Sequence, residues 1–204
     1  MTSSSRRGFS GSWSISEVSA LAIKAARGVG MPWGIAEEAG FALRWLTREG
    51  APGVAALCRY LSAYQNAPNI SVAQDEGEWI CPLRFGSAIS DGGIALPFEQ
   101  SGVREPLLLL PFLASQATER RSVVLKIDDI SIIVMAKGFT ANIVETALLI
   151  SKTDCIISFR PADSYVIKQI VNRVNPTASE CIATLTRLAH NTYAPATEAS
   201  RLAG

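Results

Sequence analysis

Apolar side chains recur every three or four residues from position 14 to position 66, the spacing of helices that bury one face. Ser14 and Glu17 form the S-x-x-E capping box that starts a first helix. Glycines at 28, 30 and 50 mark helix ends, and Pro52 marks the start of a third helix. The pattern therefore predicts three helices with these buried stripes: Val18, Ala22, Ala25 and Val29; Ile35, Ala39, Ala42 and Leu46; Val54, Leu57 and Leu61.

Residues 78–160 change to β-type patterning. The run "SVVLKIDDISIIVMAKG" holds two β-branched stretches joined by Asp128-Asp129, which predicts an antiparallel hairpin. "PLLLLPFLA" (106–114) and "DCIISFRP" (154–161) are further predicted strands. Two prolines make the first of these an edge strand or a broken one. Residues 142–151 fit a helix or a strand, and we favour a strand.

The chain becomes helical again over 163–204. Asp163 caps one predicted helix, and Thr177 with Glu180 forms a second capping box. Strands grouped together and flanked by helices indicate an α+β fold, with an N-terminal helical block, a central mostly antiparallel β-sheet and C-terminal helices. We expect a disordered tail over 1–13 and a single domain over 14–204, helical at 14–66, β-rich at 78–160 and helical at 163–204.

Charge and composition exclude several classes of protein. The 204-residue chain has 19 basic and 18 acidic residues, so it has no strong positive potential that would attract nucleic acid. The longest apolar run is far shorter than a membrane span, and the "SRRGF" segment lacks the apolar stretch of an export signal. Four scattered cysteines without CxxC spacing argue against a zinc site. We therefore expect a cytoplasmic protein with reduced thiols, no metal and no cofactor.

Residues 30–40, "GMPWGIAEEAG", place a proline, a tryptophan and a glycine before two adjacent glutamates. At about 100° per residue, Glu37 lies on the outer face of the helix and Glu38 lies beside its buried stripe. On one interpretation, Glu38 lies near the helix N-terminus only because the helix dipole favours an acidic side chain there. On the other, it acts in a site that has Trp33 as a wall. On the second hypothesis, Glu38 is the more buried acid and hydrogen-bonds to a group outside its own helix.

Residues 190–201, "HNTYAPATEASR", contain the chain's single histidine. His190 ends the last predicted helix, where an imidazole interacts favourably with the helix dipole. The functional alternative makes His190 a general base or ligand contact, with Tyr193 and Glu198 nearby. Arg201 would then pair with a charge on the ligand.

The segment "EWICPLRFG" (78–86) places Cys81 three residues before Arg84. A thiol nucleophile needs an accessible, electropositive site, and none of the local sequences of thiol enzymes surrounds Cys81. A packed cysteine is therefore the favoured interpretation. A thiol hydrolase built on Cys81 and His190 remains a weaker alternative.

Three segments, "KAARGVGMPWGIAEEAGFALRWL", "CPLRFGSAISD" and "HNTYAPATEASR", resemble stretches of an uncharacterised bacterial family, a domain of unknown function. The resemblance runs from about residue 14 onward. Its most specific parts are "PWGIAEEAG" and "TYAPATEASR". It implies no reaction, and it suggests only that these two segments belong together.

These observations give a leading hypothesis and an alternative. The leading hypothesis is a protein that binds a small polar or anionic metabolite, with Glu38 and His190 as acid–base candidates and with or without catalysis. Its predicted ligand contacts are Trp33, Arg84, Tyr193 and Arg201. The alternative is a non-catalytic interaction protein or the subunit of a homo-oligomer.

Overall fold

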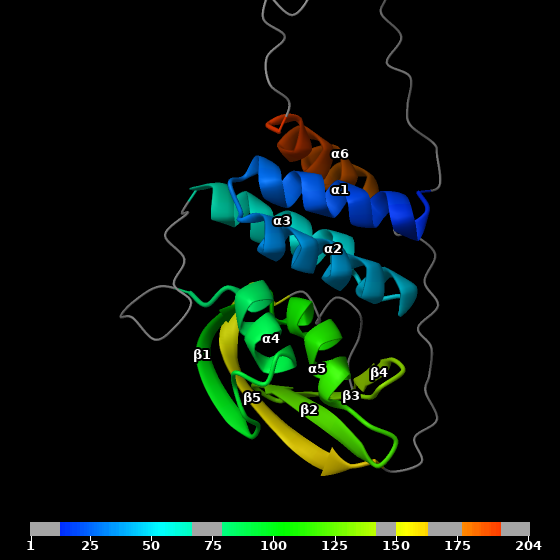
Figure 1. The fold of residues 1–204 in the computed structure, drawn as a ribbon, viewed down its shortest axis with the longest axis vertical. Helices are drawn as coiled ribbons and strands as arrows, with labels where there is room; N and C mark the ends of the chain where they lie inside the picture. The colour runs from blue at the N-terminus through cyan, green and yellow to red at the C-terminus, as the bar shows by residue number, and fades with distance from the viewer. Residues whose placement is uncertain (1–12, 67–78, 142–149, 163–176, 193–204) are drawn as a thin grey trace, which may run out of the picture.

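The computed structural model describes residues 13–66, 79–141, 150–162 and 177–192 and arranges them as helices above a sheet (Figure 1). The upper layer contains α1 (Ile15–Gly28), α2 (Trp33–Arg48), α3 (Gly53–Asn66) and α6 (Thr177–His190). The short helices α4 (Pro82–Ser90), η1 (Pro106–Leu109) and α5 (Leu110–Gln116) lie between this layer and the sheet. The predicted α+β class is confirmed.

The sheet has five antiparallel strands in the order β1-β5-β2-β3-β4. The predicted hairpin is confirmed, and Asp128 takes a left-handed conformation (φ 49°) in its turn. Ile80 forms an isolated parallel bridge on the outer side of β1. The strand bounds are β1 Phe98–Arg104, β2 Arg121–Ile127, β3 Ile130–Val134, β4 Phe139–Ala141 and β5 Lys152–Pro161.

The predicted N-terminal helices are confirmed, and the capping box of Ser14 and Glu17 is formed. Two glycines allow these helices to approach their neighbours closely. Gly40 of α2 faces α1, where the Ser19 hydroxyl donates a 3.0 Å hydrogen bond to its carbonyl. Gly28 faces α6, and a Cβ added there would overlap the Leu188 carbonyl. The contact with α6 therefore needs a residue without a side chain at position 28, and Gly40 lets α2 approach Ile23 of α1 closely.

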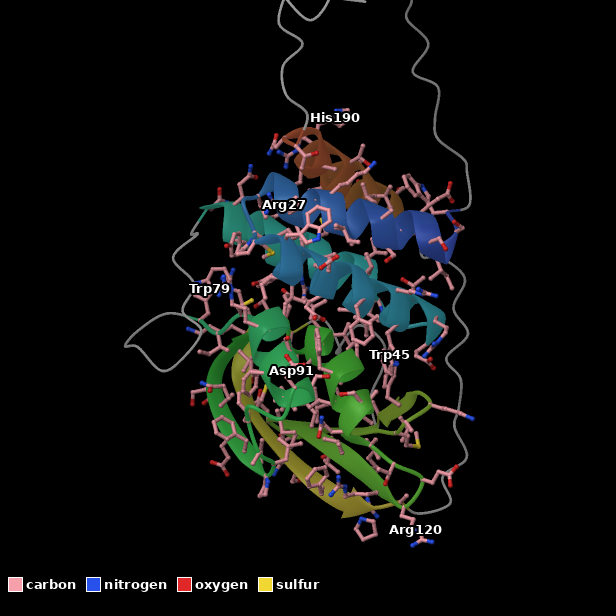
Figure 2. All side chains as sticks on the ribbon, in the orientation of Figure 1. Arg27, Trp45, Trp79, Asp91, Arg120 and His190 are labelled. Carbon is pink, nitrogen blue, oxygen red and sulfur yellow. The ribbon has the colours of Figure 1, made fainter. Side chains whose placement is uncertain are left out.

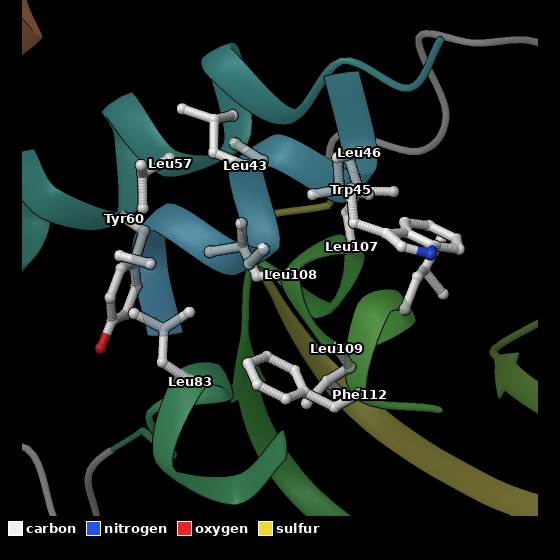
Figure 3. Packing of buried hydrophobic residues seen from close by; sticks show 14 of the residues in the cluster. Leu43, Trp45, Leu46, Leu57, Tyr60, Leu83, Leu107, Leu108, Leu109 and Phe112 are labelled. Carbon is white, nitrogen blue, oxygen red and sulfur yellow. The ribbon is translucent and has the colours of Figure 1, made fainter. Parts of the chain in front are cut away.

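The prediction of continuous β structure over 78–160 is wrong at two places. Residues 82–90 form α4, and the predicted strand 106–114 forms η1 and α5. Leu107, Leu108 and Leu109 are at most 1% exposed, because the segment is enclosed between the helical layer and the sheet (Figure 3). All-round burial removes the alternation that separates helix from strand. Both prolines of the run occupy first-turn helical positions, where no amide hydrogen is needed.

The last predicted helix is confirmed as α6, whose Leu185 and Leu188 are fully buried. It packs against α1 and α3. Most of the ambiguous segment 142–151 and the predicted helix that begins at Asp163 lie outside the described residues. None of the described helices is both long and apolar enough to cross a membrane.

Candidate functional site

Trp33 is the first residue of α2 and is 61% exposed. The turn before it is held by the Arg27 guanidinium, which donates a hydrogen bond to the Met31 carbonyl. The same guanidinium carbon lies 5.9 Å from the centre of the Trp33 ring. Pro32 and Trp33 therefore belong to the connection between α1 and α2, and the Trp33 ring lies beside the exposed Arg27.

The angular argument for the two acids is confirmed in part. Glu37 is exposed and Glu38 is half-buried, as predicted. No described residue hydrogen-bonds the Glu38 carboxylate, and most of the C-terminal segment, from which a partner was expected, lies outside the described residues. Burial raises the pKa of Glu38, and the neighbouring charges of Asp91 and Glu37 raise it further. Glu38 is thus an acid near other acids, facing the C-terminal end of α4.

His190 is the exposed last residue of α6. The next residue, Asn191, donates a side-chain hydrogen bond of 3.2 Å to the Gly28 carbonyl, which ties this end of α6 to α1. Figure 2 shows His190 above the α1–α2 layer and Asp91, the neighbour of Glu38, below it. The structure does not bring the two predicted acid–base residues together. Tyr193, Glu198 and Arg201 lie outside the described residues.

Cys81 is the N-cap of α4 and is 1% exposed. Its sulfur accepts hydrogen bonds from the Tyr60 hydroxyl (2.8 Å) and from the Arg84 amide (3.5 Å). Burial raises the pKa of the Cys81 thiol, although these hydrogen bonds oppose the shift. A buried neutral thiol is a poor nucleophile. The geometry therefore favours a packed cysteine over a thiol hydrolase.

A group of charged residues is connected to Cys81 through Tyr60 and Trp79, and the sequence predicted only Arg84 of this group as a functional residue. Arg59 of α3 binds Glu105 through two hydrogen bonds, Nε to Oε1 at 3.0 Å and Nη2 to Oε2 at 2.5 Å. Glu105 is 2% exposed and has a left-handed backbone (φ 44°) between β1 and η1. Burial raises the pKa of Glu105, and the positive charges of Arg59 and Arg104 oppose the shift.

Arg104, the last residue of β1, stacks its guanidinium on Trp79, with its carbon 3.6 Å from the ring centre. Trp79 is 9% exposed and packs edge-on against Tyr60 at 6.3 Å between ring centres. The Nε atom of Arg104 is buried and has no hydrogen-bond partner among the residues that the structure describes. A buried donor without an acceptor costs about 1–3 kcal/mol, so this atom is a candidate donor for an acceptor that the described residues do not supply.

Arg84 completes the group. It is half-buried on α4, and its charge acts on the neighbouring Tyr60 and Cys81. No ion pair joins Arg84 or Arg104 to an acid among the described residues. We call Arg59, Arg84, Arg104, Glu105, Tyr60 and Trp79 the arginine cluster. The cluster contains three guanidinium groups and one carboxylate, which leaves an excess of positive charge.

Its members were hard to predict because they are brought together only by folding. Arg59 and Glu105 are 46 residues apart, and they come from a helix and from the end of a strand. A left-handed glutamate has no distinctive sequence signal. Metal binding has no comparable support, since no three potential ligands gather within the ranges that the structure describes.

Comparison with known proteins is consistent with the resemblance seen in the sequence. Residues 13–78 match the model of a family described as "Protein of unknown function (DUF3726)". The match contains the segment 30–40 together with α1, α2 and α3, and it ends before residues 190–201. Searches of the curated proteins and of the solved structures found no match.

Proposed function

We propose that this protein binds a small anionic ligand at the arginine cluster. The observation that carries the proposal is the buried Nε of Arg104, which has no acceptor within the described part of the chain although its guanidinium is fixed against Trp79. Guanidinium groups present paired N–H donors that match carboxylate and phosphate oxygens. The ligand class is therefore a carboxylate or a phosphate.

The rest of the cluster explains why Arg104 and Arg84, rather than Arg59, would contact the ligand. Arg59 already has both hydrogen bonds of a bidentate pair with Glu105. Arg104 is held in place by Trp79, so that little side-chain freedom is lost on binding. Arg84 adds a second positive charge from α4, next to the Tyr60 that packs against Trp79. The proposal moves the predicted site away from Trp33 and His190 but keeps Arg84 as a ligand contact.

Thermal unfolding in the presence of inorganic phosphate or citrate, at constant ionic strength, tests the proposal. A ligand at 100 times its Kd stabilises the folded state by about 2.7 kcal/mol, which corresponds to a rise in Tm of roughly 5–10 °C for a chain of this size. Arg104→Gln should abolish the rise. Arg104→Lys should abolish most of it, because lysine keeps the charge but not the planar fork.

Arg44→Gln is the matched control, because Arg44 is exposed on α2 and the substitution removes the same charge. It should leave the shift intact. If Arg104→Gln does not fold, Arg84→Gln on α4 is the second test variant, and it should reduce the rise in Tm. Equal shifts in the wild type and all variants would show non-specific ion effects and overturn the proposal. The absence of a shift with either anion in the wild type would also overturn it.

A further inference from the structure

The four thiols of the chain differ in their neighbours. The Cys81 sulfur accepts a hydrogen bond from the Tyr60 hydroxyl, and Cys155 is buried on β5. Cys58 of α3 and Cys181 of α6, in contrast, are neighbours, and the Cys181 thiol helps to raise the pKa of Cys58. They come from two helices that pack together although they are more than a hundred residues apart in the chain.

The surroundings of this pair are polar. The hydroxyls of Thr184, one turn along α6, and Ser62, one turn along α3, also lie beside Cys58 and lower the pKa of its thiol. Cys58 is 8% exposed, whereas Cys181 is only partly buried. A reagent from solution would therefore reach Cys181 first, with Cys58 already beside it.

We propose that Cys58 and Cys181 form a reversible disulfide that joins α3 to α6. The oxidant is a low-molecular-weight disulfide such as oxidised glutathione. The Cys181 thiolate attacks one of its sulfurs, which forms a mixed disulfide and releases one glutathione thiolate. Cys58 then loses its proton to water and attacks the Cys181 sulfur, forming the protein disulfide and releasing the second glutathione. Two protein thiols are oxidised, and one disulfide is reduced to two thiols.

The chemistry of the two thiols assigns this order. Burial and the neighbouring Cys181 thiol raise the pKa of Cys58 to about 11, so Cys58 is protonated near neutral pH and attacks only after Cys181 has been activated. Since α6 is attached to the described body through α1 and α3, the bond would fix its contact with α3. Cross-linking two distant positions restricts the unfolded chain, so the oxidised protein should unfold at a Tm higher by about 5–15 °C.

The test incubates the native protein with oxidised glutathione and measures its intact mass and its linked peptides. The wild type should lose the mass of two hydrogen atoms and yield a single cross-link between Cys58 and Cys181. Cys58→Ser should stop at the mixed disulfide and gain the mass of one glutathione less two hydrogen atoms. Cys155→Ser, the control, should form the same cross-link as the wild type.

Circular dichroism before oxidation establishes that each variant is folded. A cross-link between another pair of cysteines would overturn the proposal. Native protein that keeps all four thiols free, under conditions in which unfolded protein is oxidised, would overturn it as well. A Cys58→Ser variant that still loses the mass of two hydrogen atoms would do the same.

Discussion

Replacing Gly28 with alanine tests the contact between the first and last described helices. An alanine Cβ would overlap the Leu188 carbonyl oxygen and would lie 2.8 Å from the carbonyl carbon. Non-bonded carbon atoms prefer separations of about 3.5–4.0 Å. The obstacle is backbone, which cannot rotate away as a side chain can, so α6 must move by roughly 1 Å relative to α1.

The size of the effect has two limits. If α6 shifts and stays docked, overpacking of this kind costs about 1–3 kcal/mol. If α6 separates, Leu185 and Leu188, both 0% exposed, lose their burial, at about 1.5–3 kcal/mol each. Alanine recovers up to about 1 kcal/mol through its better helix propensity. We expect a net loss of about 3 kcal/mol, which lowers Tm by roughly 6–12 °C.

Gly34→Ala is the matched control, since Gly34 is also helical and a Cβ there would meet no atom within 4 Å. That variant should be unchanged or more stable by up to about 1 kcal/mol. Differential scanning calorimetry of both variants compares the two sites directly. The reasoning is refuted if Gly28→Ala is as stable as Gly34→Ala.

Two further substitutions follow from the site geometry. The pKa of Glu38 is raised in the folded protein, so ionising this carboxylate destabilises the fold. That cost is absent below the unfolded pKa of about 4.5 and grows as pH rises through the folded pKa. Glu38→Gln should therefore increase the free energy of unfolding at pH 7 by less than about 1 kcal/mol. Urea titrations at pH 7 and pH 4 measure this, with Glu37→Gln as control, and a stability gain that persists at pH 4 would contradict it. Cys81→Ala should cost about 1–3 kcal/mol because the Tyr60 hydroxyl loses its buried acceptor, more than the ~1 kcal/mol typical of point mutants. Adding Tyr60→Phe should recover part of that loss in urea, and a double mutant no more stable than Cys81→Ala would show that the hydrogen bond does not matter.

The parts of the fold that could be predicted from the sequence are those fixed by local rules. Helix periodicity and the capping box located α1, and β-branched runs around Asp128-Asp129 located the β2–β3 hairpin. The difference in burial between Glu37 and Glu38 followed from helix angles alone. The leucine run at 107–110 was wrongly predicted as a strand, because a segment buried on every side has no polar positions to show its period.

The candidate site was less predictable for a related reason. A lone arginine such as Arg59 or Arg104 resembles any solvated surface residue until its tertiary partner is known. The ion pair to Glu105 and the stack on Trp79 depend on how α3, β1 and the residues before α4 meet. Arg84 was identified only because it follows Cys81, whose own expected chemistry the geometry does not favour.

The order of the strands determines when the molecule can fold. β5 lies between β1 and β2, so the sheet is incomplete until residues 152–161 have been made. The helical layer is closed just as late, since Asn191 bonds to Gly28 across 163 residues. Contacts between such distant positions form slowly, because a long loop must close before they contribute any stability. We therefore expect closure of these long-range contacts to limit folding, and we expect a nascent chain that ends before β5 to expose the facing edges of β1 and β2.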